Sequence, residues 1–146
     1  MRGGERSTGA ESRGRSAVAS RALRKQEVFV AEDDPDLRPA VGELLGEAGY
    51  RPVLFGTANE LLAYLDRTTP AAIVTDMAMP GLSGSELVAE LRKSERWRGI
   101  PVVVMTGNND TALPLRVDAP VVYKPDIGNV VALIGTLLRK SPAGRR

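Results

Sequence analysis

A short apolar run that ends on a carboxylate constrains the fold of this chain more than any other feature. Residues Ala71–Thr75 are long enough for one strand and are followed at once by Asp76. A mostly apolar run of this length is typical of a strand buried on both faces, as in a parallel sheet. Pro80 and Gly81 then break regular structure, and Ser83 begins a Ser-x-x-Glu capping box that opens a helix. The sequence therefore predicts Asp76 at the carboxyl end of a buried strand, where open α/β sheets bind ligands.

Short apolar runs alternate with helical patterns along the rest of the chain. Strands are expected at residues 28–31, 52–55, 71–75, 101–105 and 121–123, and helices at residues 35–48, 57–66, from 83 to about 91, and after 125. This alternation predicts an α/β fold, a parallel sheet with helices on both faces and right-handed crossovers. Between Thr106 and Val121 there is room only for a short or irregular fourth helix, which Pro114 interrupts.

Length and composition limit the classes of protein to be considered. The 146 residues suffice for one domain with a substantial core, and the chain shows neither a membrane span nor the apolar segment of a secretory signal. We therefore expect a cytoplasmic domain. Cysteine and histidine are both absent, which excludes disulfides, thiolate or histidine metal sites, and a phosphohistidine made on this chain.

The two ends of the chain are basic, although the formal net charge is only +2. Residues 1–26 hold seven Arg or Lys against two Glu, and residues 139–146 hold four basic residues and no acid, so residues 27–138 carry a net charge of −7. The first segment has too few large apolar residues to offset its ordering entropy. We expect a disordered basic N-terminal tail over 1–26, a folded domain over 27–138 and a basic C-terminal tail over 139–146. The tails are either solvated ends or loose contacts for nucleic acid, a membrane or an acidic partner.

Polar residues stand at the carboxyl ends of four of the expected strands. Glu32 and Asp33 follow the first strand, Asp76 the third, Thr106 the fourth and Lys124 the fifth. In a parallel sheet these ends share one edge, so the side chains should converge. Crowded carboxylates repel one another unless a cation lies among them, and oxygen-only ligands suit Mg²⁺. The ammonium and the hydroxyl suit a phosphoryl group, which makes Asp76 a candidate nucleophile for phosphoryl transfer.

These motifs resemble the receiver domain of two-component response regulators. The resemblance spans residues 27–138 and rests on four segments, Val30–Pro35, Thr75–Gly81, Met105–Gly107 and Tyr123–Pro125. It implies a flavodoxin-like, doubly wound sheet of five parallel strands in the order 2-1-3-4-5. It also implies a phospho-acceptor signalling domain, not an enzyme acting on other substrates, which catalyses only its own phosphorylation and dephosphorylation.

The resemblance assigns roles by position. Asp76 matches the phospho-acceptor and Asp33 a direct Mg²⁺ ligand. Glu32 matches a second acidic position that acts through water, and the backbone carbonyl of Ala78 would complete the protein ligands.

Thr106 and Lys124 match the residues that respond to the phosphoryl group. In the family, an aromatic side chain three residues before the lysine follows the threonine inward. Here that position is Val121, so the usual aromatic switch is missing. Tyr123 shares a strand face with Val121 and is a candidate substitute.

The resemblance also implies the partners. Since the chain has no histidine, the phosphoryl donor must be a separate sensor histidine kinase or histidine phosphotransfer protein. Only eight residues follow Leu138, so we expect a single-domain response regulator without a DNA-binding output domain. Its output would then be a protein–protein contact or a phosphorelay to a downstream target.

Two alternatives remain open at this point. A phosphorylation-independent scaffold or adaptor is favoured mildly by Val121 and disfavoured by the intact acidic and basic positions. A magnesium-dependent aspartyl-phosphate hydrolase would fit the Asp-x-Asp spelling of Asp34 to Asp36, but the intervening proline and the lack of length for a cap domain weigh against it. These two aspartates fit better as acids in the first turn of a helix.

Overall fold

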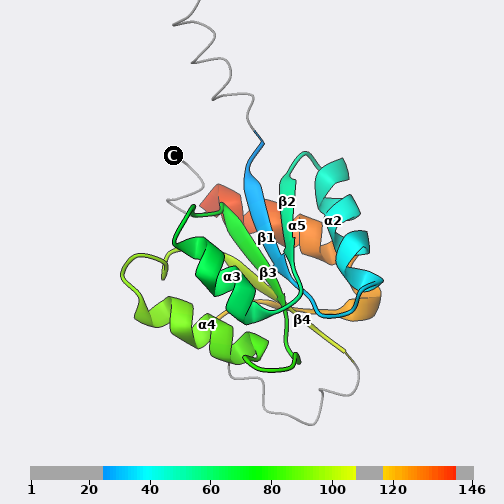
Figure 1. The fold of residues 1–146 in the computed structure, drawn as a ribbon. Coiled ribbons are helices and arrows are strands. Elements are labelled where there is room, and N and C mark those ends of the chain that lie inside the picture. Colours follow the sequence, from blue (N-terminus) through cyan, green and yellow to red (C-terminus); the bar gives the residue numbers. More distant parts are fainter. Residues whose placement is uncertain (1–24, 108–116, 141–146) are drawn as a thin grey trace, which may run out of the picture.

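The computed structural model describes residues 25–107 and 117–140 (Figure 1). Most of both expected tails, and the expected short fourth helix, fall on residues 1–24, 108–116 and 141–146, which lie outside the described residues. The described chain continues as helix to Lys140, past the domain boundary expected at Leu138.

Five parallel strands form one sheet in the order β2-β1-β3-β4-β5. The strands are β1 (Glu27–Ala31), β2 (Arg51–Phe55), β3 (Ala72–Asp76), β4 (Val102–Thr106) and β5 (Val121–Tyr123). Every residue of β3 and β4 is buried, which explains why these strands read as continuous apolar runs rather than alternating ones. The predicted fold class and strand order are confirmed.

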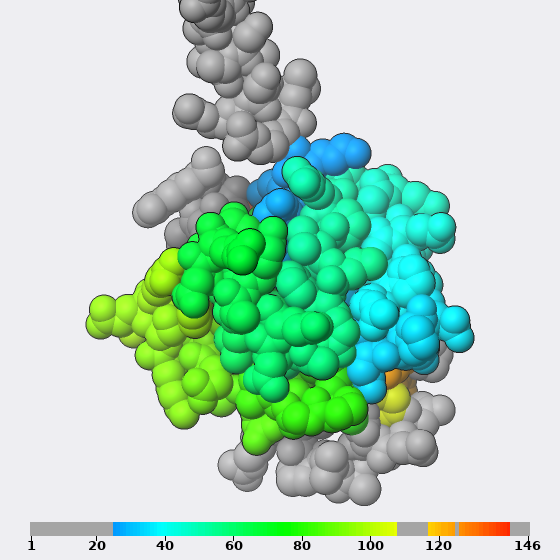
Figure 2. Space-filling model, in the orientation of Figure 1, coloured from blue at the N-terminus to red at the C-terminus, as the bar shows by residue number. Residues whose placement is uncertain are grey.

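Helices cover both faces of the sheet. They are α2 (Leu37–Glu47), α3 (Ala58–Leu65), α4 (Gly84–Lys93) and α5 (Gly128–Lys140). Helices α3 and α4 lie over the face seen in Figure 2, and α5 lies behind the sheet in Figure 1. Alternate residues of each strand serve alternate faces. Phe29 and Ile73 therefore pack under α3 and α4, whereas Val30 and Val74 pack under α2 and α5.

The two expected capping boxes differ in the structure. Ser83 and Glu86 form the complete box at the start of α4. At the start of α3, Thr57 accepts the backbone N–H of Glu60 as expected, but the Glu60 carboxylate accepts the N–H of Gly56 at 3.2 Å. Both arrangements fix a helix start on the edge of the sheet where the strands end. None of the helices in the described ranges is long and apolar enough to cross a bilayer.

Candidate functional site

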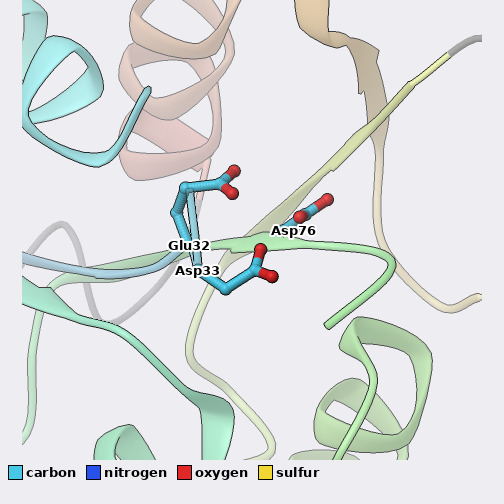
Figure 3. A group of neighbouring side chains, drawn as sticks. All are labelled: Glu32, Asp33 and Asp76. Carbon is cyan, nitrogen blue, oxygen red and sulfur yellow. The ribbon is translucent and has the colours of Figure 1, made fainter. Parts of the chain in front are cut away.

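Three carboxylates gather at the carboxyl edge of the sheet (Figure 3). Glu32 and Asp33 follow the end of β1, and Asp76 is the last residue of β3. These strands are neighbours, and one carboxylate oxygen of each residue lies within 4.8 Å of the others. Glu32 and Asp76 are buried, whereas Asp33 is exposed. The pairing of β1 with β3 thus produces the convergence that the sequence predicts.

Lys124 brings a single ammonium group to this cluster from the end of β5. Its Nζ donates a hydrogen bond to Oδ2 of Asp76 at 3.0 Å and lies 3.7 Å from Oε1 of Glu32. The short 3-10 turn η2 (Lys124–Asp126) begins at this lysine. One positive charge therefore faces two buried carboxylates and a third exposed one.

Burial and the contacts within this cluster shift the pKa values of Glu32, Asp76 and Lys124. Burial raises the pKa of Glu32 to about 7, and the negative charge of Asp76 acts in the same direction. The hydrogen bond from the Asp34 backbone N–H and the positive charge of Lys124 both lower this pKa, but they do not outweigh burial. Burial also raises the pKa of Asp76, against the hydrogen bond and charge of Lys124. Burial opposes the charged form of Lys124 too, but its hydrogen bond to Asp76 and the nearby carboxylates outweigh burial and raise its pKa. Burial therefore opposes the ionised forms of Glu32 and Asp76 more strongly than Lys124 favours them.

Two buried oxygens fit the site for a cation. Oε1 of Glu32 and Oδ1 of Asp76 accept no hydrogen bond within the part of the chain that the structure describes. Buried acceptors without a partner are costly, and a hard divalent cation takes oxygen ligands of this kind. The exposed carboxylate of Asp33 supplies a third oxygen on the solvent side. Ala78 is exposed in the loop after β3, and its carbonyl stays a predicted ligand.

Thr106 reaches the same edge as the last residue of β4. Thr106 is 5% exposed. Its strand β4 lies between β3 and β5: Met105 of β4 pairs with Asp76 of β3, and Thr106 pairs with Tyr123 of β5. Its hydroxyl lies 3.4 Å from the carbonyl oxygen of Gly107. The topology therefore brings Thr106 to the edge that carries the carboxylates, and its role as a sensor stays a prediction.

The two residues considered for the aromatic switch have different surroundings. Val121 is partly buried against the cluster under α3 and α4. Tyr123 is 43% exposed, so its ring does not occupy the interior in this structure.

Asp34 is used by the start of α2. Its Oδ1 accepts the backbone N–H of Asp36 at 2.8 Å and that of Leu37 at 3.2 Å. These hydrogen bonds lower the pKa of Asp34. The Asp34 carboxylate therefore accepts backbone N–H groups at the N-terminus of α2, and the Asp-x-Asp motif of residues 34–36 is not part of the carboxylate cluster.

Two residues near the site were missed by the sequence reasoning. Gly84, the first residue of α4, is buried, and a β-carbon there would overlap the carbonyl oxygen of Asp76. Arg38 donates from Nη1 to the carbonyl oxygen of Glu32 at 2.8 Å. The close approach of Gly84 to Asp76 could have been found from the glycine at the first position of a helix. The contact of Arg38 with Glu32 left no signal in the sequence, because it depends on how α2 packs against β1.

Comparisons with known proteins agree with this geometry. Residues 28–119 match the family model of the response regulator receiver domain. The transcriptional regulatory protein FixJ of Bradyrhizobium diazoefficiens is 34% identical over 95 residues, which cover 65% of this chain and 44% of FixJ. The transcriptional regulatory protein BaeR of Escherichia coli is 32% identical over 118 residues, which cover 77% of this chain and 48% of BaeR. This chain therefore spans less than half the length of either relative.

The fold is also similar to that of a solved receiver domain. The signal receiver domain of a histidine kinase from Syntrophus aciditrophicus superposes with a TM-score of 0.72 at 26% identity, covering 79% of this chain and 91% of that one. The family model matches well over half of this chain, and the 2-1-3-4-5 sheet presents acidic residues at its carboxyl edge. The chain belongs to the response regulator receiver domain family of two-component signalling.

Proposed function

We propose that this receiver domain accepts a phosphoryl group on Asp76 in a Mg²⁺-dependent reaction. The donor is the phosphohistidine of a sensor histidine kinase or histidine phosphotransfer protein. The observation that carries the proposal is the state of the Asp76 carboxylate. It is 1% exposed, its Oδ2 is held by Lys124 at 3.0 Å, and its Oδ1 accepts no hydrogen bond from the described residues. The contact with Lys124 fixes the orientation of this carboxylate, and its Oδ1 is available to a cation, so the group meets the positional requirements of a carboxylate nucleophile beside a metal ion.

Glu32, Asp33 and Asp76 would hold the Mg²⁺ ion, through oxygen atoms that suit a hard cation. When bound, Mg²⁺ neutralises charge on the phosphoryl oxygens and orients them. Softer metals have no preferred ligand here, because the chain contains neither cysteine nor histidine.

The transfer is a displacement at phosphorus. A carboxylate oxygen of Asp76 forms the new P–O bond as the P–N bond of the donor breaks, and the imidazole nitrogen keeps the electron pair. The acyl phosphate carries roughly −1.5 to −2 charges where one carboxylate stood. The Lys124 ammonium, already 3.0 Å from Asp76, balances part of that charge, and Thr106 can turn its hydroxyl toward it from β4.

The new charge supports output through a partner. It appears at an edge shared by β3, β4 and β5, so a response of Thr106 or Lys124 is transmitted to the segments that follow these strands. We infer that the signal leaves by protein–protein contact or by phosphorelay. The domain itself catalyses no reaction beyond its own phosphorylation and dephosphorylation. That the receiver domain acts as a single-domain response regulator, without a linked output domain, stays a prediction.

Intact mass after incubation with acetyl phosphate and Mg²⁺ tests the proposal. The natural chain should gain a single phosphoryl adduct, which Asp76→Asn and chelation by EDTA should both abolish. Asp36→Asn is the matched control, because Asp36 is exposed and lies outside the carboxylate cluster. If the natural chain stays unmodified while a known receiver is modified, the phosphorylation-independent scaffold replaces this proposal.

A further inference from the structure

The edge of the sheet opposite the carboxylate cluster carries many basic residues. Strand β1 begins and helix α5 ends at this edge (Figure 1), and the described chain carries Lys25, Arg139 and Lys140 at these two points. Six exposed or partly exposed basic residues of the helix ends and loops lie at the same edge: Arg51, Arg67, Arg92, Lys93, Arg96 and Arg98. Four of them form ion pairs with acids of this edge, whereas Arg67 and Arg98 have no ion pair among the described residues. The acidic cluster lies at the other edge of the sheet, so Arg67 and Arg98 face no carboxylate of that cluster.

A pocket of about 220 Å³ opens at this basic edge. It lies between the end of α4, the residues that lead into β4 and the last turn of α5. Its lining combines the apolar residues Ile100, Pro101 and Leu137 with the exposed cations Arg98 and Lys140. We refer to it as the basic-edge pocket. An apolar floor with a cationic rim suits a ligand that carries an anion beside an apolar group.

Arg92 gives this pocket a fixed wall. Its guanidinium donates to the carbonyl oxygens of Arg98 and Ile100, each at 3.0 Å, and of Asp118 at 3.1 Å. Its Nε also lies 3.6 Å from the carboxylate of Asp118, which is 86% exposed. Asp118 therefore offsets the charge of Arg92, while Arg98, which forms no ion pair among the described residues, adds positive charge at the rim. A wall tied by three hydrogen bonds needs little ordering when a ligand binds.

We propose that the basic-edge pocket docks an acidic segment of a partner protein in which a carboxylate lies next to an aliphatic side chain. The carboxylate meets Arg98 beside Lys140, and the aliphatic side chain packs on the partly exposed Leu137 next to the almost fully buried Ile100. A nucleic acid backbone would use the cations but leave the apolar floor in water, and the pocket lining offers no aromatic ring on which a base could stack. The basic residues of the chain ends accelerate encounter with an acidic partner. This inference does not depend on phosphorylation of Asp76.

The test uses the full chain and a fluorescent synthetic peptide of Glu-Leu repeats, with binding followed by anisotropy at low salt. Arg98→Glu should weaken binding about tenfold, because it replaces an attraction by a repulsion at the rim. Arg67→Glu is the matched control: Arg67 is exposed at the same edge but does not line the pocket, and its variant should bind within about twofold of the natural chain. Circular dichroism verifies that both variants keep the fold.

Two comparison ligands complete the test. A peptide of Glu residues alone should bind about tenfold more weakly than the Glu-Leu peptide, since it leaves the apolar floor uncovered. Equal binding of the two peptides, or equal losses in Arg98→Glu and Arg67→Glu, would overturn the proposal. Tighter binding of a DNA duplex that Arg98→Glu weakens would assign the pocket to nucleic acid instead, and no binding of any ligand would also reject it.

Discussion

Gly84 lies so close to Asp76 that a β-carbon on Gly84 would overlap the carbonyl oxygen of Asp76. The Gly84 N–H also donates to the carbonyl oxygen of Met77 at 2.8 Å, and Ser83 closes the capping box just before it. The first turn of α4 therefore packs directly against the carboxyl end of β3. The backbone that carries the candidate phospho-acceptor is positioned by a helix start as well as by its strand neighbours.

Gly84→Ala should destabilise the domain and slow phosphorylation of Asp76. The methyl group forces β3 and α4 apart, which costs about 1–3 kcal/mol in the free energy of unfolding even though alanine favours helix by about 1 kcal/mol. Urea denaturation and the rate of acetyl phosphate labelling measure the two effects. Gly128→Ala is the control, because Gly128 is the first residue of α5 and has open space where the β-carbon would stand. Equal stability of the two variants would contradict the prediction.

The strands were predictable because burial on both faces leaves a direct trace in the sequence. Residues Ala72–Asp76 and Val102–Thr106 are buried throughout, so apolar runs bounded by polar or turn residues indicate them. The edge strand β2 begins at Arg51 and is only partly buried, so its start was less evident. The convergence of Glu32, Asp33 and Asp76 followed from parallel strands alone, since parallel strands end at one edge.

Contacts that depend on how helices sit on the sheet could not be predicted. The capping-box motif allows the Glu60 carboxylate to accept the backbone N–H of either Thr57 or Gly56, and only the conformation of the folded loop determines that it accepts from Gly56. Arg92 joins carbonyls as far along the chain as Asp118, a separation at which local pattern carries no information. The raised pKa of Glu32 likewise depends on complete burial of a side chain that the sequence presents as an ordinary acid.

The metal-free domain should lose stability as the pH rises from about 4.5 to about 7. Glu32 in the folded chain keeps its proton up to about pH 7, whereas in the unfolded chain it releases the proton near pH 4.5. The folded state therefore binds more protons in this window, so the free energy of unfolding falls with pH, by roughly 1–3 kcal/mol. Above this window both states are ionised and the contribution is constant. Urea denaturation in EDTA across this range measures the slope.

Glu32→Gln is the control for this slope. The amide has nearly the same shape and does not titrate, so the decline between about pH 4.5 and about pH 7 should flatten. Glu43→Gln, on the exposed side of α2, should leave the decline unchanged. A decline that persists in Glu32→Gln would assign it to other groups.

The affinity for Mg²⁺ should rise with pH over the range from about 6 to about 8. A Mg²⁺ ligand must be ionised, and Glu32 with a pKa of about 7 has to release its proton when the ion binds. Calorimetry in buffers of different ionisation enthalpy should detect this proton release, and Asp33→Asn should weaken binding by removing the exposed carboxylate of the cluster. An affinity independent of pH would show that Glu32 is already ionised, or that it takes no part in binding.

Lys124→Ala should separate phosphorylation from the response to it. Lys124 is the cation that donates to the Asp76 carboxylate, and its side chain is 28% exposed. Its removal should therefore lower the free energy of unfolding of the metal-free domain by about 1–2 kcal/mol, less than the loss of one partner of a fully buried ion pair. Asp76 itself remains, so at saturating Mg²⁺ the variant should still gain the phosphoryl adduct. Without the ammonium, the new charge no longer draws β5 toward Asp76. The change in amide hydrogen exchange that accompanies phosphorylation should therefore be lost around Val121 to Tyr123.

Two variants sharpen the interpretation of this last experiment. Lys93→Ala removes an exposed lysine that pairs only with Glu90 among the described acids, so it should keep the full exchange response. Lys124→Arg retains the positive charge but places it on a longer, planar group, and should restore part of the response. If Lys124→Ala shows the same phosphorylation-dependent exchange pattern as the natural chain, the lysine serves only to neutralise Asp76 in the resting domain. The signal would then have to pass through β4 and Thr106 alone.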